Sequence, residues 1–336
     1  MEPLIECIPN FSEGRNIDTL NAITDVLDNS EGVMLLHRDV GHAANRTVFT
    51  FSGAPEAVFN AAFEAMKVAG ERIDMSFQQG THPRIGATDV CPFVPIRGIT
   101  LDELVPMVHA FGKRIGDELG INGYFYEATA INPKNKSLAI ARKGRYEGLP
   151  ARIKEEKPDF GPAEFNPKQG ATLIAARDYL VAFNINLDTR SAEIAHKIAC
   201  EVRESGFWTE ENGERVKHPG KLKHLRSLGW FIEEYGIAQV SCNLINFRET
   251  GMHTVYETVK EVASRYKVKV TGSELIGMSP AKALIDAGLH YTNDANRTTD
   301  ELIQAAVEAM NLDELHEFDI VDRVIEIAIR NRQLIG

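Results

Sequence analysis

The sequence predicts an α/β (α+β) protein with two subdomains, and three observations support this prediction. The chain has 336 residues, a length that favours two domains over one. Short β-branched and aromatic runs alternate with longer segments whose apolar residues recur at helical spacing. The same order of strands and helices occurs once in each half of the chain, and a mostly helical extension follows the second half.

The first half predicts the order strand, helix, strand, strand, helix, strand. Ile17, Leu20 and Ile23 fall at helical spacing, and Asn16 can cap the helix that they begin. We expect strands at 4–9, 33–40, 46–52 and 88–96, and helices at 16–29 and 55–73. Pro92 and Pro95 favour a sheet edge or a strand end for the last of these strands. The order is that of a ferredoxin-like βαββαβ unit.

An irregular segment follows this unit. A helix is expected at 101–119, where Thr100 and Glu103 form a capping-box pattern, and a strand at 123–128. From 132 to 170 the pattern changes to a basic run around 142–145, a short helix near 150–156, and a stretch rich in proline and glycine. Such a stretch excludes helix and regular strand, and loops of this length are more often functional than idle. We therefore expect a linker or a binding loop here.

The second half repeats the architecture without repeating the residues. Strands are expected at 179–187, 225–234, 237–247 and 267–271, and helices at 191–205 and 252–266. The helices of the extension are expected at 281–291, 299–310 and 320–330. Two ferredoxin-like sheets, each with helices on one face, would pack together through their open faces and leave a cleft between subdomains.

Composition excludes several classes of function. With 37 basic and 48 acidic residues the net charge is −11, which argues against nucleic acid or an anionic membrane as partner. The four cysteines form no CxxC pair and indicate a reduced, cytoplasmic protein. We find no signal peptide, no membrane-spanning window, and neither a G-x-G-x-x-G nor a Walker A motif, so no nucleotide cofactor is expected.

His82 is the first candidate for catalysis. It lies in the stretch GTHPRIGATDVCPFVPI, where Gly80 permits unusual dihedrals and Pro83 biases His82 toward extended or turn geometry. An imidazole on a stiff loop that enters a buried strand is well placed for proton transfer near neutral pH. A structural turn histidine is the alternative that this pattern leaves open.

Polar residues near the strand ends of the first half are candidates for substrate binding. They are Asp39, Asn45, Arg46, Arg84 and Asp89. Arginine holds carboxylates through two parallel hydrogen bonds, so a substrate that carries carboxylates is expected. The acidic side chains, with Glu13, could instead face a cation or the donor edge of a guanidine-like heterocycle. Ordinary loop polarity remains an alternative.

A metal site is the weaker interpretation of the same region. His37, Asp39 and His42 are credible ligand types, but they lie within six residues and no distant fourth ligand is evident. A charged loop is the simpler interpretation, and we expect no metal. His109, His196 and His253 fall on expected helices and are interpreted as packing or surface residues.

Five motifs resemble glutamate formimidoyltransferase, an enzyme family of histidine breakdown. They are ECIPNFSEG at 6–14, NRTV at 45–48, HPRIGATDVCPF at 82–93, PDFGP at 158–162 and AFNINL at 182–187. The similarity extends from residue 1 to about residue 288. Nothing in the sequence resembles the cyclodeaminase that is fused to this transferase in animals, so the resemblance implies a stand-alone transferase.

The resemblance also implies a set of site residues and partners. It implies formiminotransferase subdomains at 1–180 and 181–336, a homodimer, tetrahydrofolate as co-substrate, and His82 as the catalytic acid and base. It places folate binding on Gly161, Pro162, Ala163, Glu164, Phe165, Asn166, Pro167, Lys168, Gln169 and Gly170. The animal-type pattern has tryptophan at the position of Gln169. The charged insertion around 209–217 is a further difference and is expected to be a surface loop.

The implied chemistry needs one proton carrier. A formimidoyl group would move between N5 of tetrahydrofolate and the α-amine of glutamate, and one group with a pKa near 7 could take the proton from one nitrogen and return it to the other. Asp39 or Asp89 would face the amidine, and Arg46, Arg84 or Lys168 the carboxylates. The sequence does not separate this reaction from formyl transfer or from a glycine acceptor. It also leaves open a folate-binding protein without activity and a purely structural dimer.

Overall fold

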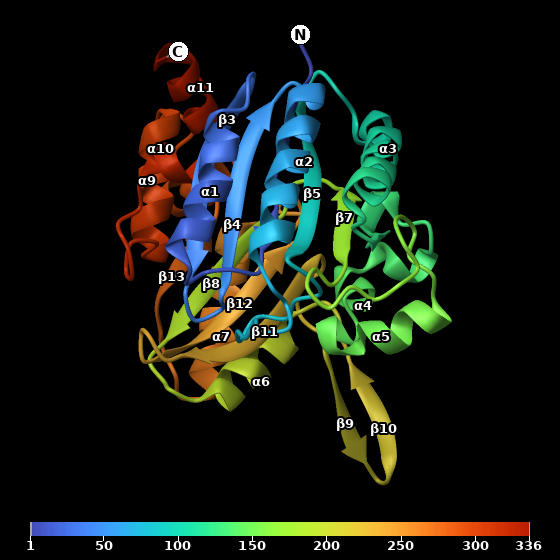
Figure 1. Ribbon diagram of the computed structural model, residues 1–336. Helices are drawn as coiled ribbons and strands as arrows, with labels where there is room; N and C mark the ends of the chain where they lie inside the picture. The colour runs from blue at the N-terminus through green and yellow to red at the C-terminus, as the bar shows by residue number, and fades with distance from the viewer. Residues whose placement is uncertain (1, 336) are drawn as a thin grey trace. The chain divides into compact units, whose positions relative to one another are not determined.

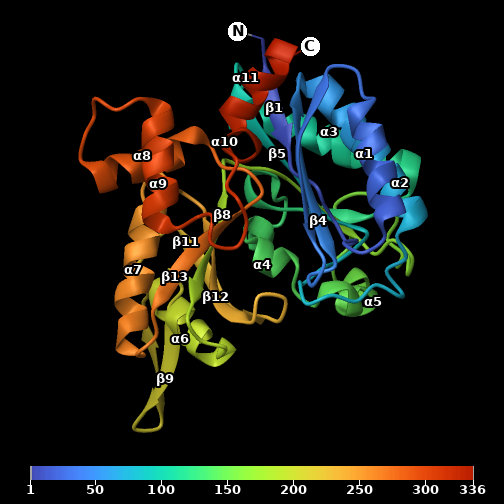
Figure 2. The same ribbon diagram turned by 90° about the vertical axis from the view of Figure 1, so that its left-hand side faces the viewer.

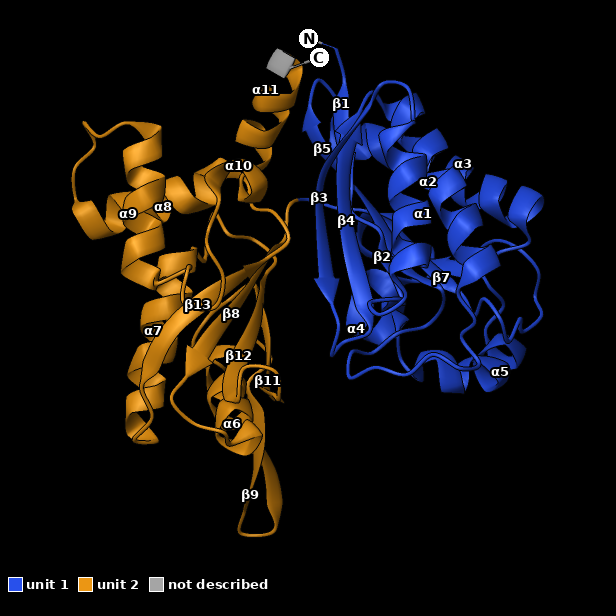
Figure 3. Cartoon of the chain, turned by 60° about the vertical axis from the view of Figure 1, so that its left-hand side comes forward, with its two compact units in different colours: residues 1–178 blue, residues 179–336 orange. Residues whose placement is uncertain are grey.

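The computed structural model describes residues 2–335 and divides the chain into two compact units, one ending at Asp178 and one beginning at Tyr179 (Figure 3). Each unit has its own sheet and its own hydrophobic core. Within the described residues, no helix combines the length and the apolar character that a bilayer crossing requires.

The sheet of the first unit contains a ferredoxin-like core. Its strands are β1 (Leu4–Cys7), β2 (Asn10–Phe11), β3 (Val33–Gly41), β4 (Arg46–Gly53), β5 (Thr88–Arg97), β6 (Gly123–Phe125) and β7 (Thr172–Ala176). β1 lies between β4 and β5 and pairs antiparallel with both, and β3 pairs with β4. β7 and then β6 extend this core by parallel pairing beyond β5. The βαββαβ prediction is confirmed.

Three long helices cover one face of this sheet (Figure 1). They are α1 (Ile17–Asp28), α2 (Pro55–Arg72) and α3 (Leu101–Leu119). Asn16 caps α1 through the backbone N–H of Thr19, and Thr100 and Glu103 form the predicted capping box of α3. The buried rings of Phe49, Phe51 and Phe93 belong to the core between this face and the helices.

A smaller core lies on the opposite face of β5, β6 and β7. Residues that alternate along these strands divide between the two cores, with Phe93 in the first and Val90 in the second. The second core is completed by Ala141 of α4 (Leu138–Ala141) and Leu149 of α5 (Arg145–Glu155). The 3₁₀ turns η1 (Glu127–Thr129) and η2 (Pro133–Lys136) connect β6 to α4. This segment brings the basic run of 142–145 to the site described below.

Of the two positions expected for the strand with Pro92 and Pro95, a sheet edge or a strand end, the sheet edge is wrong. β5 pairs with β1 and β2 on one side and with β7 on the other. Pro92 lies where the β1 and β2 ladders on β5 are interrupted, and its carbonyl oxygen accepts from Ile8 N. Pro95 lies beyond Phe93, the last β5 residue that pairs with β7.

The second unit repeats the ferredoxin-like order in a four-stranded sheet. Its strands β8 (Val181–Leu187), β11 (Leu225–Ile232), β12 (Ile237–Leu244) and β13 (Val270–Ile276) are arranged as β11-β12-β8-β13. The helices α6 (Ala192–Val202) and α7 (Met252–Arg265) cover the sheet, and α8 (Ala281–Thr292) and α9 (Thr299–Met310) pack on each other next to α7 (Figure 2).

Three details of the second unit differ from the sequence prediction. The charged insertion is not a loop but a hairpin of β9 (Phe207–Glu211) and β10 (Glu214–His218), in which Arg215 lies over the ring of Trp208. β13 begins three residues later than expected, at Val270. The last expected helix is divided into α10 (Ile320–Arg323) and α11 (Ile325–Ile335), because Val324 is extended between them.

Candidate functional site

The loop that carries His82 is fastened to the turn between β3 and β4. Asn45 accepts a hydrogen bond from Gln78 Nε2 at its backbone oxygen and donates one to Gln79 O, both at 2.9 Å. Thr81 N donates to Ala43 O. A Cβ on Gly80 would lie 2.1 Å from Ala44 O, so glycine is required here for close approach of two backbones. This contact brings His82 next to Arg46, the first residue of β4.

A second segment holds the same loop from the α4–α5 side. Tyr146 N donates to Arg84 O at 3.0 Å. Asp89 is fully buried, accepts from Ile85 N at 2.9 Å, and forms an ion pair with Nη2 of Arg142 at 2.7 Å. Arg142 is therefore fixed against the start of β5, seven residues after His82.

The ring of His82 is half-buried and has a defined tautomer. Its Nδ1 lies 2.6 Å from the carbonyl oxygen of Pro83. A carbonyl oxygen only accepts, so Nδ1 carries the hydrogen in the neutral ring and Nε2 holds the lone pair. Nε2 is thus the atom of this ring that can take a proton from a ligand.

The surroundings of His82 oppose its protonation. Burial, followed by the positive charges of Arg46, Arg142 and Arg145, lowers the pKa of His82 to about 2. The hydrogen bond to Pro83 acts in the other direction but is outweighed. The expectation of a pKa near 7 is therefore wrong for the ligand-free protein, in which His82 is a neutral imidazole.

This environment predicts a pH dependence of stability. The unfolded chain protonates His82 near the ordinary pKa of 6.5, whereas the folded chain does so only near 2. The contribution of this group to stability is thus present above pH 6.5 and is lost as the pH falls below it. Between pH 6 and 5 we expect the free energy of unfolding to fall more steeply for the wild type than for His82→Gln, by up to about 1.4 kcal/mol per pH unit. Urea unfolding at several pH values measures this, and parallel curves for the two proteins would contradict it.

Arg46 is the most unusual charged group of the site. Burial lowers its pKa to about 10, against the opposing effects of Asp89 and Asp39. Its Nε is buried and has no hydrogen-bond acceptor among the described residues. The Nε of Arg142 is buried without an acceptor as well. Two guanidinium groups next to a neutral imidazole form a site suited to an anion.

Other predicted substrate contacts are occupied by protein partners. Asn45 donates to Gln79 O and accepts from Gly14 N, and both oxygens of Asp89 are engaged as described above. Arg84 is bonded to Gln78 and Glu147. These three residues hold the loop in place, and contact between them and substrate stays a prediction. Asp39 is half-buried on β3, and its negative charge raises the pKa of Arg46.

The predicted folate segment, 161–170, is joined to the His82 loop at its end. Gly170 forms a bridge with Gly86, Ala171 N donates to Ile85 O, and Gln169 O accepts from Ala87 N. Lys168 Nζ donates to Glu71 O, so this lysine is held against α2. Residues 161–164 are exposed. The structure therefore brings His82 and this segment together within one unit.

Several other histidines have surroundings of their own. His109 bonds to Thr129 O and its ring lies against Phe125, while His253 stacks on His290. His196 and His42 are exposed. Among residues 2–335, no group of three histidine, cysteine or acidic side chains is placed to hold a metal ion.

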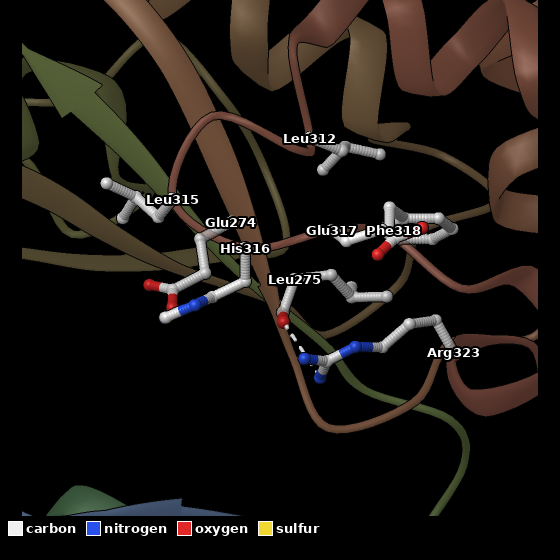
Figure 4. A pocket seen from close by; sticks show the side chains of 8 residues that line it. All are labelled: Glu274, Leu275, Leu312, Leu315, His316, Glu317, Phe318 and Arg323. Atoms are coloured by element: carbon white, nitrogen blue, oxygen red, sulfur yellow. Dashed lines mark hydrogen bonds between the residues drawn. The ribbon is translucent and has the colours of Figure 1, made fainter.

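A small hollow in the second unit is unrelated to these residues. It is lined by side chains that include Glu274, His316 and Arg323, and Arg323 donates to Leu275 O (Figure 4). All of its lining residues belong to the second unit, whereas His82, the arginines and the 161–170 segment belong to the first.

The sequence analysis did not single out two arginines of the site, nor an exposed phenylalanine in the loop before His82. Arg142 and Arg145 were visible only as part of a basic run, because their approach to His82 depends on tertiary contacts. Phe77 lies in the loop between α2 and His82, and its side chain is 82% exposed. In the sequence, this phenylalanine stands beside Gln78 and Gln79, just before the GTHP motif, and that position could have indicated an exposed ring.

Comparison with known proteins gives matches over nearly the whole chain. Residues 4–177 match a family model described as the formiminotransferase domain, N-terminal subdomain, and residues 182–330 match the formiminotransferase domain. The chain is 44% identical over 293 residues to the glutamate formimidoyltransferase of Streptococcus pyogenes serotype M1, covering 87% of this chain and 94% of that one. Identity to the Thermoplasma acidophilum enzyme of the same name is 40%, covering 86% and 92%.

Longer proteins also match. The formimidoyltransferase-cyclodeaminase of Dictyostelium discoideum is 43% identical over 335 residues, which are 98% of this chain and 61% of that protein. The chain thus spans about three-fifths of the length of these longer relatives.

Proposed function

The chain belongs to the formiminotransferase domain family, and from this premise we propose that it transfers a formimidoyl group between N-formimidoyl-L-glutamate and tetrahydrofolate, in histidine degradation. The products would be L-glutamate and 5-formimidoyltetrahydrofolate. The observation that carries the proposal is the neutral His82, with Nε2 as its basic atom, on a loop bonded to the 161–170 segment.

His82 would carry the proton of the reaction. N5 of tetrahydrofolate attacks the amidine carbon, a tetrahedral carbon forms, and the bond to the glutamate nitrogen breaks. The proton that N5 loses passes to Nε2 of His82, which gives it to the departing nitrogen. The ring returns to its starting tautomer, because Nδ1–H remains bonded to Pro83 O throughout. Holding the two substrates together supplies the rest of the rate enhancement.

A direct assay tests the activity. Purified protein is incubated with tetrahydrofolate and with formimidoylglutamate, formylglutamate or formimidoylglycine, and the folate product is identified by mass spectrometry. We expect the highest kcat/KM with formimidoylglutamate. A higher value with formylglutamate would assign formyl transfer, and tetrahydrofolate binding without product would assign a binding protein.

The 161–170 segment and Phe77 are proposed to contact tetrahydrofolate. Met75 N donates to Lys168 O, which fixes the loop of Phe77 beside this segment. The ring of Phe77, which is 82% exposed, offers a stacking surface for a pterin or an aminobenzoyl ring. This chain has Gln169 at the position where the animal-type pattern has a tryptophan.

Removal of this ring should weaken folate binding. We expect Phe77→Ala to raise the KM for tetrahydrofolate about 2- to 10-fold, the equivalent of about 0.5–1.5 kcal/mol for an aromatic pair, with an unchanged KM for formimidoylglutamate. Phe77→Tyr is the matched control and should keep the wild-type values. Equal KM values for the alanine variant and the wild type would remove Phe77 from the site.

We further propose a homodimer in the cytoplasm, with tetrahydrofolate as co-substrate and without metal or nucleotide. Sedimentation equilibrium measures the assembly, and metal analysis of the purified protein with activity after chelator treatment tests the absence of a metal requirement.

A further inference from the structure

Two guanidinium groups near His82 each have a buried donor that the protein does not satisfy. The Nε atoms of Arg46 and Arg142 are buried and have no acceptor among the described residues. Buried polar atoms in native proteins are rarely left without a partner, and an unpaired buried charge is costly. The two unpaired Nε donors are therefore expected to serve a ligand.

Both arginines belong to segments that are bonded to the His82 loop. Arg46 begins β4 directly after Asn45, which is bonded to Gln78 and Gln79. Arg142 is held by Asp89, and Tyr146 of the same segment is bonded to Arg84. The backbone of Arg46 and the guanidinium of Arg142 are thus positioned by contacts within a single unit.

We propose that Arg46 and Arg142 form a subsite for the α-carboxylate of the amino-acid substrate, and that filling this subsite prepares His82 to accept a proton. The identity of the amino acid rests on the function proposed above. A carboxylate suits the donors because an arginine pair can satisfy its oxygens with charge-assisted hydrogen bonds.

The chemistry selects the α-carboxylate over the γ-carboxylate. The nitrogen that exchanges the formimidoyl group is attached to the α-carbon, and the α-carboxylate is attached to the same carbon. A proton carrier that reaches this nitrogen therefore has the α-carboxylate as its nearest substrate anion. The γ-carboxylate is two carbons farther along the side chain.

Binding of this anion would change the charge balance around His82. The positive groups that act on the ring are Arg46, Arg142 and Arg145, and the acidic groups Asp89 and Asp39 act on Arg46. Tyr126 is buried near Arg46, and its pKa is raised by burial, so it stays neutral. A carboxylate between the arginines offsets their repulsion of an imidazolium. The base would then gain proton affinity only when the amino-acid substrate is in place.

Isothermal titration calorimetry tests this with stable analogues. N-formyl-L-glutamate is titrated into the full chain near pH 5.5 in two zwitterionic buffers that differ in ionisation enthalpy. We expect binding with net proton uptake for the wild type and binding without this uptake for His82→Gln. N-formyl-4-aminobutanoate, which lacks the α-carboxylate, should bind at least about 10-fold more weakly and without proton uptake.

Variants of the arginines complete the test. We expect Arg46→Gln to weaken binding of N-formyl-L-glutamate about 10- to 100-fold and Arg46→Lys to lose less, because lysine keeps the charge. Arg114→Gln, on α3, where Arg114 is bonded to Asn60 of α2, is the control and should bind as the wild type does. Circular dichroism confirms that each variant is folded.

The outcomes separate this subsite from the proposed function. Wild-type affinity in folded Arg46→Gln, equal binding of the two analogues, or no proton uptake would overturn the subsite even if tetrahydrofolate turnover is normal. Tight binding of N-formyl-L-glutamate with proton uptake, in a chain that shows no turnover with tetrahydrofolate, would support the subsite and overturn the reaction.

Discussion

Replacement of His82 by glutamine should lower kcat for formimidoyl transfer by about 10²- to 10⁴-fold, the usual contribution of a general acid and base. Glutamine is the informative substitution because it keeps a polar side chain of similar length but has no basic nitrogen. What it removes is the proton acceptor at Nε2. The KM for tetrahydrofolate should change little, because the 161–170 segment and the Phe77 loop are left intact.

Steady-state kinetics with both substrates measure this effect. His42→Gln is the matched control: its side chain is exposed on the turn before Asn45, and it should retain wild-type kcat. Turnover of His82→Gln within a few-fold of the wild type, with folate bound normally, would show that another group moves the proton.

Much of the fold could be predicted because its signals are local. The first residues of α1 and α3 follow from the N-caps Asn16 and Thr100, whose side chains accept from backbone N–H groups three residues away. The strand order followed from the βαββαβ pattern in both units. β7 was missed, since TLIAA, a threonine followed by four apolar residues, has no alternation that would mark a buried parallel strand.

The site was less predictable because its electrostatics depend on distant residues. His82 and its motif are evident in the sequence, but its low pKa comes from burial and from arginines at positions 46, 142 and 145. Arg142 reaches the site through an ion pair with Asp89, across 53 residues of chain. A loop arginine of this kind has no local pattern that separates it from ordinary surface charge. The same long-range contact pairs Asp89 with Arg142, whereas the sequence suggested Asp89 as a substrate contact.

The ion pair of Asp89 and Arg142 is also expected to dominate the stability of the site. Asp89 is 0% exposed, and its removal leaves Arg142 unpaired and Ile85 N without an acceptor. We expect Asp89→Ala to lower the free energy of unfolding of the first unit by about 3–5 kcal/mol, since a buried charge that loses its partner keeps its desolvation cost. Urea unfolding followed by far-UV circular dichroism is the measurement, because both tryptophans, Trp208 and Trp230, lie in the second unit.

Two further variants separate the ion pair from general damage to the unit. Asp117→Asn breaks an exposed ion pair with Lys113 on α3 and should cost at most about 0.5 kcal/mol. The double variant Asp89→Ala with Arg142→Met removes both charges together and should be more stable than Asp89→Ala alone, because no unpaired guanidinium remains. If the double variant were less stable than the single one, the loss would belong to packing and the Ile85 hydrogen bond rather than to the buried charge.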